Sequence, residues 1–410
     1  MTPHLIDPTL RDGEQAGAPA LVRHRPGRLR FNRNEFAGAL GDIGTSLPLL
    51  VGVTLAAKLN VATVLTVFGA MQIFTALRYR LPMPVQPLKA MAALVIAQGI
   101  SGSVLHGAGL AIGICMLIFT VTGGVDTLSR FVPLAVVRGL QLGLGLTLAS
   151  LALKKYVASD GPAGYALAAV VFLIVLALFG NRRVPAALVA VGIGMIYAVL
   201  FKSGSLPRDW SVHLNLPQFS LPASQDILTG FVLLALPQIP LSLGNSVLAT
   251  GQIARDLFPE RRITNRMIGY TYSLMNLVTP MFGGVPVCHG SGGMAGHYAF
   301  GARTGGSVLL YGSVLLLAGV CFGPVFNSMV GAFPLPVLGV MLLFESISLL
   351  LLTRDVLNQQ RGFIIAVITG LAACYLPYGF AIGLVLGTTL EKASARWSIS
   401  FLSPEPAQSA

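Results

Sequence analysis

The residues best suited to chemistry lie in Pro286–Gly296, which reads PVCHGSGGMAG between two long apolar runs. The imidazole of His289 can donate a hydrogen bond or carry a proton, and Ser291 adds a hydroxyl group. Glycine has no Cβ atom, so the backbone at Gly290 and Gly292 is open to close approach by a ligand. Such a set of donors in apolar surroundings indicates a binding site for a polar ligand.

The neighbouring Cys288 does not make this segment catalytic. A cysteine nucleophile needs a base and a group that orients it, and no orienting acid is apparent. The four cysteines also lack CxxC and CxxCH spacing, so disulfides, structural zinc and covalent haem have no support. We therefore expect neither an enzyme nor a bound metal or cofactor. The polar first thirty residues show no cleavable signal peptide.

The elements that must position this site are membrane spans. The chain is 54% hydrophobic and only 10% charged, whereas a soluble domain usually carries about 25% charged residues. Runs such as 170–180 and 308–326 are apolar enough to enter or cross a hydrocarbon core roughly 30 Å thick. We predict an all-α polytopic membrane protein with about fourteen transmembrane segments.

Lysine and arginine are distributed unevenly over the predicted loops. With the N-terminus in the cytoplasm, most of the 27 basic residues fall on the cytoplasmic side. Those on the opposite side are Lys58, Lys154, Lys155, Lys202 and Arg208. This asymmetry follows the positive-inside rule. The net charge of +12 therefore reflects topology rather than nucleic-acid binding, and we expect an inner (plasma) membrane protein with both termini in the cytoplasm.

The two halves of the chain resemble each other at an offset of about 200 residues. LGD at 40–42 is echoed by LGN at 243–245, and PV at 84–85 is echoed by PV at 286–287. Seven segments per half is an odd number, so the second copy must be inverted relative to the first. Inverted repeats are a recurring architecture of secondary transporters, with the binding site near the membrane midplane.

The paired PV positions predict two half-helices, segments 3 and 10, over 85–100 and 289–300. Three prolines in 82–87 favour extended backbone there, and a helix can begin near Pro87. Gly283–Pro286 breaks the second copy in the same way. Both helices are too short to cross the bilayer, so we expect them to meet at the midplane.

Two facing helix N-termini favour an anion, because free N–H groups and the helix dipole both carry partial positive charge. A tetrahedral oxyanion fits better than a flat base, since no aromatic residue for stacking lies within either break. The residues predicted to bind it are Gln86, Lys89, Asn245, Cys288, His289, Gly290, Ser291 and Gly292.

Four further residues are predicted to couple protons or to support the site: Asp42, Thr45, Gln238 and Glu345. A carboxylate inside a span costs about 2.5–3.5 kcal/mol on insertion scales, so Asp42 needs a partner or a role. It either binds a proton beside the anion or is a hydrogen-bonded structural group. Lys89 either attracts substrate or pairs with Asp42, and Glu345 either couples transport or bonds between helices.

Four segments carry a resemblance to a known family: FAGALGDIGTSLPLL, PMPVQPLKAMAA, ALPQIPLSLGNSVLAT and FGGVPVCHGSGGMAGHYAFGARTGG. They resemble the signature segments of the molybdate transporter family related to sulfate permeases, over about residues 31–392. The resemblance implies a seven-plus-seven inverted repeat, molybdate as substrate and, as in related permeases, a homodimer.

The resemblance also implies a division into core and gate. The core comprises 31–127 and 226–331, and the gate comprises 128–225, with its linker, and 332–392. A basic arm (1–30) precedes them, and a short cytoplasmic tail (393–410) follows, without the STAS domain of sulfate permeases.

We therefore expect proton-coupled molybdate import by movement of core past gate. Asp42 is the first candidate for the proton carrier and His289 the second. The alternatives are a sulfate or other oxyanion permease and, more remotely, a nucleobase permease. Residues 7–16, DPTLRDGEQA, resemble an N-terminal signature of homocitrate synthases, but the membrane spans that follow leave no room for that enzyme's barrel.

Overall fold

The computed structural model describes residues 28–124, 132–178, 181, 184–201 and 211–396, which are mostly helical. The first part contains α1 (Arg33–Ala39), α2 (Ile43–Ala56), α3 (Val61–Tyr79), β1 (Val85–Pro87), α4 (Lys89–Gln98) and α5 (Gly102–Val121). The next part contains α7 (Leu134–Leu151), the π-helical η1 (Ala152–Tyr156), α8 (Gly161–Ala177) and α9 (Ala186–Phe201).

The second half begins with one long, partly π-helical rod. Its elements are α10 (Ser224–Gly230), η3 (Phe231–Ala235), α11 (Leu236–Leu241), η4 (Ser242–Ala249) and α12 (Thr250–Leu257). Next come α13 (Asn265–Val278), η5 (Thr279–Phe282), β2 (Val287–His289), α14 (Ser291–Ala299) and α15 (Gly306–Ala332). The last elements are α16 (Leu335–Leu351), η6 (Leu352–Val356), α17 (Gln360–Tyr375) and α18 (Gly379–Arg396).

Polar side chains set where several helices begin. Asn60, Ser101 and Thr264 stand before α3, α5 and α13, and each side chain accepts a hydrogen bond from an amide three residues further on. These residue types are favoured N-caps because they satisfy a backbone donor that the helix leaves free.

The carboxylate of Glu35 satisfies the start of another helix far away in the sequence. Its Oε1 atom accepts from the amides of Arg303 and Thr304 at 3.0 and 2.9 Å, and Oε2 accepts from the amide of Ser307 at 3.0 Å. Glu35 is only 2% exposed. This buried carboxylate therefore ties α1 to the start of α15.

The described helices differ in whether they can cross a bilayer. Six stretches are long and apolar enough: Val61–Tyr79, Gly102–Val121, Leu134–Tyr156, Ser224–Leu257, Gly306–Ala332 and Leu335–Val356. By contrast, α4 has ten residues and α14 has nine, or roughly 15 Å at about 1.5 Å per residue. Neither α4 nor α14 can span the membrane alone.

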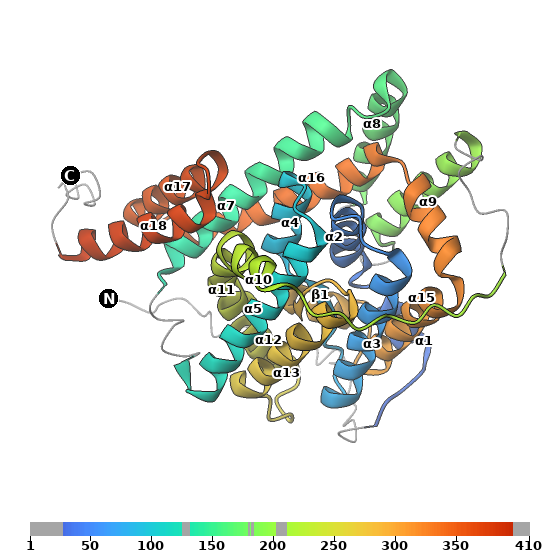
Figure 1. Cartoon of the computed structure of the whole chain (residues 1–410), viewed down its shortest axis with the longest axis horizontal. Coiled ribbons are helices and arrows are strands. Elements are labelled where there is room, and N and C mark those ends of the chain that lie inside the picture. The colour runs from blue at the N-terminus through green and yellow to red at the C-terminus, as the bar shows by residue number, and fades with distance from the viewer. Residues whose placement is uncertain (1–27, 125–131, 179–180, 182–183, 202–210, 397–410) are drawn as a thin grey trace, which may run out of the picture.

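Two groups of helices are visible in Figure 1. α7 and α16–α18 run along the upper side of the view, α3, α12 and α13 lie on the lower side, and α15 rises along the right. α7 packs against α16 and α17, and α3 packs against α15. The α3–α15 crossing depends on Gly69, where a Cβ atom would lie 2.5 Å from the amide nitrogen of Leu316.

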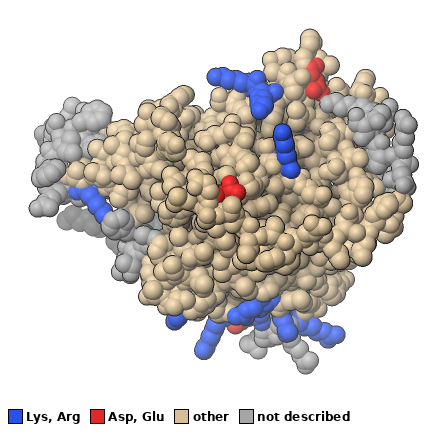
Figure 2. Space-filling view, viewed as in Figure 1, with Lys and Arg blue, Asp and Glu red and all other residues tan. Residues whose placement is uncertain are grey.

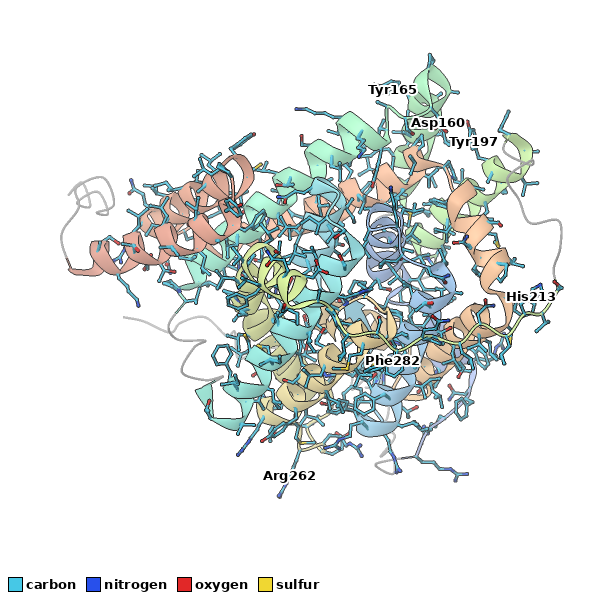
Figure 3. The ribbon with its side chains drawn as sticks, in the orientation of Figure 1. Asp160, Tyr165, Tyr197, His213, Arg262 and Phe282 are labelled. Atoms are coloured by element: carbon cyan, nitrogen blue, oxygen red, sulfur yellow. The ribbon has the colours of Figure 1, made fainter. Side chains whose placement is uncertain are left out.

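Charged side chains lie mainly at two opposite edges of the molecule. Lysines and arginines gather along the lower edge of Figure 2, a smaller group lies at the top, and the broad surface between is nearly uncharged. In Figure 3, Arg262 marks the lower edge and Asp160 lies near the upper one. An uncharged belt between charged edges is the surface that a bilayer requires.

Candidate functional site

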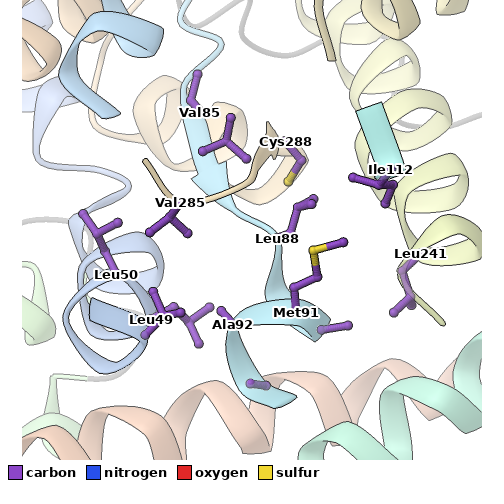
Figure 4. Close-up of a cluster of buried hydrophobic side chains, with 14 of the residues drawn as sticks. Leu49, Leu50, Val85, Leu88, Met91, Ala92, Ile112, Leu241, Val285 and Cys288 are labelled. Carbon is purple, nitrogen blue, oxygen red and sulfur yellow. The ribbon is translucent and has the colours of Figure 1, made fainter. Parts of the chain in front are cut away.

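The two predicted chain breaks lie side by side. β1 and β2 pair antiparallel, with Gln86 opposite Cys288, inside a cluster of buried apolar side chains (Figure 4). Because the strands are antiparallel, α4 and α14, which follow them, lead away in opposite directions. β1 confirms extended backbone over Val85–Pro87, within the expected range 82–87, and α14 begins at Ser291 as expected.

Each strand is held by one buried amide side chain from the preceding helix. Gln72 of α3 donates to the carbonyl oxygen of Val85 at 2.7 Å and accepts from the amide of Val85 at 2.8 Å. Asn276 of α13 does the same to Val287, at 2.6 and 2.9 Å. These two-point contacts satisfy backbone groups that would be costly to bury unpaired.

A cavity of about 240 Å³ lies at this strand pair. All eight residues predicted to bind substrate line it, together with Gln238 and Glu345. The other lining residues are Ala90, Gln141, Leu144, Leu241, Ser246, Ser348, Leu349 and Leu352. Since a water-sized oxygen occupies roughly 30 Å³, the cavity has room for the four oxygens of a tetrahedral oxyanion.

The start of α14 offers free donors to this cavity. Within the described part of the chain, the amides of Ser291 and Gly292 have no acceptor. A Cβ atom at Gly292 would meet nothing within 4 Å, whereas one at Gly290 would lie 2.4 Å from the side chain of Gln86. Gly290 is therefore required by packing, while Gly292 faces open space.

The start of α4 differs from the prediction of a second open helix terminus. The Oε1 atom of Gln238 accepts hydrogen bonds from the amides of Ala90 and Met91, at 3.0 and 3.2 Å. The Nε2 atom of Gln238 donates to Ser242 at 3.1 Å. Two of the donors expected to face an anion are thus already occupied, because an amide on the facing helix reaches them first.

Lys89 forms its ion pair with Glu345, rather than with the Asp42 partner considered from the sequence. Its Nζ atom lies 2.6 Å from Oε1 of Glu345. The Lys89 side chain is 35% exposed and that of Glu345 only 5%. The pair joins α4 to α16 across the cavity, so Glu345 makes the interhelical bond that the sequence left as one of its alternatives.

His289 is buried at the cavity wall. Its Nε2 atom lies 2.7 Å from the hydroxyl oxygen of Thr271, and its ring packs edge-on against that of Tyr79 at 5.4 Å between centroids. Its Nδ1 atom has no hydrogen-bond partner among the described residues. Nδ1 is therefore the ring atom still able to bond a ligand or a water molecule.

Asp42 lies behind the cavity wall rather than in it. It immediately precedes α2, is fully buried, and accepts a hydrogen bond from Gln86. Gln86, which lines the cavity, is thus one contact between Asp42 and the site. Thr45 belongs to α2, but its side chain lies outside the part that the structure describes.

Several residues at the site had no signal in the sequence. Gln141, Ser246 and Ser348 line the cavity, and Gln72 and Asn276 hold the strands. Each is a single polar residue within an apolar run. Polar residues inside a membrane often need a partner, and this was the one feature that could have pointed to them.

Comparison with known proteins places this arrangement in a family. The family model described as molybdate transporter of the MFS superfamily matches residues 34–148 and 230–349, more than half of the chain. This chain belongs to the molybdate transporter family. Molybdate transporter 2 of Arabidopsis thaliana is 33% identical to it over 89% of both chains.

Solved structures of other anion transporters share this family member's fold. The transmembrane domain of the bicarbonate transporter BicA from a cyanobacterium matches with a TM-score of 0.66 at 17% identity, over 88% of this chain and 98% of that one. Murine Slc26a9, an anion transporter in the inward-facing state, matches with 0.67 at 13% identity, over 90% of this chain and 69% of that one. The fold is therefore that of the SLC26-like transporters.

Family membership decides between the function classes left open by the sequence. The protein is a multi-pass integral membrane transporter and not an enzyme. The homocitrate synthase-like stretch at 7–16 lies outside the described residues.

Proposed function

We propose that this protein is a secondary active transporter that imports molybdate. The observation that carries the proposal is the convergence, on one cavity, of the free amides of Ser291 and Gly292 and the ammonium group of Lys89. Amides at a helix N-terminus and a nearby cation stabilise an oxyanion in a site shielded from water. Membership of the molybdate transporter family supports molybdate as that oxyanion.

The chain is built as an inverted repeat of seven plus seven segments. Equivalent side-chain hydrogen bonds in the two halves support this. Gln72 bonds the backbone of Val85 thirteen residues further on, and Asn276 bonds the backbone of Val287 eleven residues further on. The antiparallel pairing of β1 with β2 also agrees with two copies of opposite orientation.

The repeat forms a core (31–127 and 226–331) and a gate (128–225 and 332–392). The cavity is lined by residues of both, since Gln141 belongs to α7 and Glu345 to α16. Movement of the core past the gate opens the site to one side of the membrane at a time.

Import is coupled to protons. Bringing a dianion into a cell at about −100 mV costs roughly 4.6 kcal/mol of electrical work, so accumulation requires at least two cotransported protons for electroneutrality. Asp42, buried beside Gln86, is the first candidate carrier, and His289 is the second. The basic edge with Arg78, Arg261 and Arg262 faces the cytoplasm of a plasma-membrane protein.

Competition binding tests the substrate. Radiolabelled molybdate is bound to purified protein and displaced by unlabelled molybdate, tungstate or sulfate. Displacement by molybdate and tungstate at concentrations that leave sulfate without effect supports the proposal. Equal displacement by sulfate would make the protein a general oxyanion permease, and no binding of any of the three would refute the site.

A further inference from the structure

The Lys89–Glu345 pair differs in position from two other ion pairs among the described residues. Arg138–Asp355 and Arg361–Glu391 each join two gate elements. Lys89–Glu345 instead connects α4 of the core to α16 of the gate, and both of its residues line the cavity. The ion pair therefore lies at the wall of the proposed substrate cavity.

An anion in this cavity would compete with Glu345 for Lys89. Lys89 lines the same cavity as the free amides of Ser291 and Gly292 that would hold the anion. A bound dianion attracts the Lys89 ammonium and repels the Glu345 carboxylate, and both effects are strong where water is scarce. When a buried carboxylate loses its cation, protonation lowers its free energy because it removes the unpaired charge.

We propose that the substrate replaces Glu345 as the partner of Lys89, and that the released Glu345 carboxylate takes up one of the coupling protons. This inference rests on the proposed function. The reaction is a simple protonation, in which the carboxylate oxygen of Glu345 and one proton form a carboxylic acid. Release of the anion reverses the step, because Lys89 reforms its pair and the proton leaves.

The formal charges around the site support two proton carriers. When the site is empty, Lys89, Glu345 and Asp42 together carry one net negative charge. With a dianion bound and both carboxylates protonated, the net charge is again one negative. Loading therefore leaves the charge of the site unchanged, as electroneutral import requires. Asp42 can bind only one coupling proton, and Glu345 binds the second.

Several other titratable groups lie near Lys89 and Glu345. The charge of Asp42, which immediately precedes α2, also acts on Lys89. Cys288 and His289 line the same cavity as Glu345. Arg138 is bonded to Asp355 and Gln141. The remaining charged or titratable residues on described elements packed against α16 are Lys154, Lys155, Tyr156, Tyr165, Tyr197 and Arg354.

The same exchange explains how binding could release the core. In the empty protein the ion pair ties α4 to α16. Once Lys89 turns to the substrate and Glu345 is neutral, this charged link between core and gate is absent. Movement then becomes easier only when anion and proton are both present, which prevents a leak of either alone.

The experiment measures protons taken up when molybdate binds. Purified protein is titrated with molybdate by calorimetry in buffers of different ionisation enthalpy, which gives protons bound per molybdate. E345Q should take up about one proton fewer than the unmodified protein while still binding molybdate. E391Q, which alters an ion-paired carboxylate away from the cavity, should match the unmodified protein.

An infrared difference spectrum of the unmodified protein makes the test independent of the variant's folding. Molybdate should produce the carbonyl band of a newly protonated carboxylic acid, and E345D should shift that band. An unchanged proton number in E345Q, or a spectrum without the band, would overturn the assignment of Glu345. Failure of the unmodified protein to bind molybdate would instead overturn the proposed function.

Discussion

The open space at Gly292 provides the sharpest test of where the substrate lies. A methyl group at this position would meet no protein atom within 4 Å, and Gly292 lies in the first turn of α14 with ordinary helical backbone. Gly292→Ala should therefore fold normally, because alanine is favoured over glycine in a helix by roughly 0.5–1 kcal/mol. Gly292 itself, however, lines the cavity that the anion is proposed to fill, so the methyl group would be added at the cavity wall.

The expected loss of affinity follows from the contacts that the methyl group displaces. If it keeps the anion from one of the two amides of Ser291 and Gly292, it removes a charge-assisted hydrogen bond worth about 1.5–3 kcal/mol. Since each 1.4 kcal/mol is about tenfold, molybdate binding should weaken roughly 10- to 150-fold.

The assay is equilibrium binding of molybdate to the purified variant, with thermal unfolding measured on the same sample. Gly192→Ala is the matched control, because Gly192 on α9 also has nothing within 4 Å of an added Cβ atom but does not line the cavity. It should bind as the unmodified protein does. Wild-type affinity in a well-folded Gly292→Ala protein would show that the anion does not approach the start of α14.

Three further predictions concern proton coupling and stability. Asp42→Asn in proteoliposomes should abolish the stimulation of molybdate uptake by an inward proton gradient, and uptake rates equal to those of the unmodified protein would remove Asp42 from that role. Gln238→Leu leaves the amides of Ala90 and Met91 without an acceptor, so it should lower the free energy of unfolding by at least about 1–3 kcal/mol. Gln238→Glu keeps an acceptor oxygen and should therefore destabilise the protein less. Thermal unfolding of both variants measures the difference. Glu35→Ala should destabilise the protein by at least about 1.5 kcal/mol, measured by chemical unfolding in detergent; a change below about 0.5 kcal/mol would contradict the capping role.

Local backbone chemistry made the two chain breaks predictable. Proline restricts its own backbone and that of the residue before it, so the extended segment at 82–87 and the short helix after it could be inferred without a tertiary structure. The same applies to Gly283–Pro286 and the start of α14. Their equivalent spacing in the two halves then indicated that they belong to one site.

Partner choice inside the membrane was less predictable. The sequence analysis recognised three ionisable groups that need partners: Lys89, Asp42 and Glu345. It considered an ion pair between Lys89 and Asp42, whereas the structure pairs Lys89 with Glu345. Gln238 was expected to support the site, yet its occupation of two α4 amides had no sequence signal. Long polar side chains reach several neighbours, so small differences in helix position decide between them.

The sequence by itself determined the membrane location and the two broken segments, because composition, proline and glycine act over a few neighbouring residues. It also predicted that the helix starts of these segments bind an anion. Only the tertiary structure decided that one helix start is open while the other is capped by Gln238, and that Lys89 bridges to α16. Those outcomes depend on side chains that lie about 150 to 250 residues apart in the chain and meet only when the helices have packed.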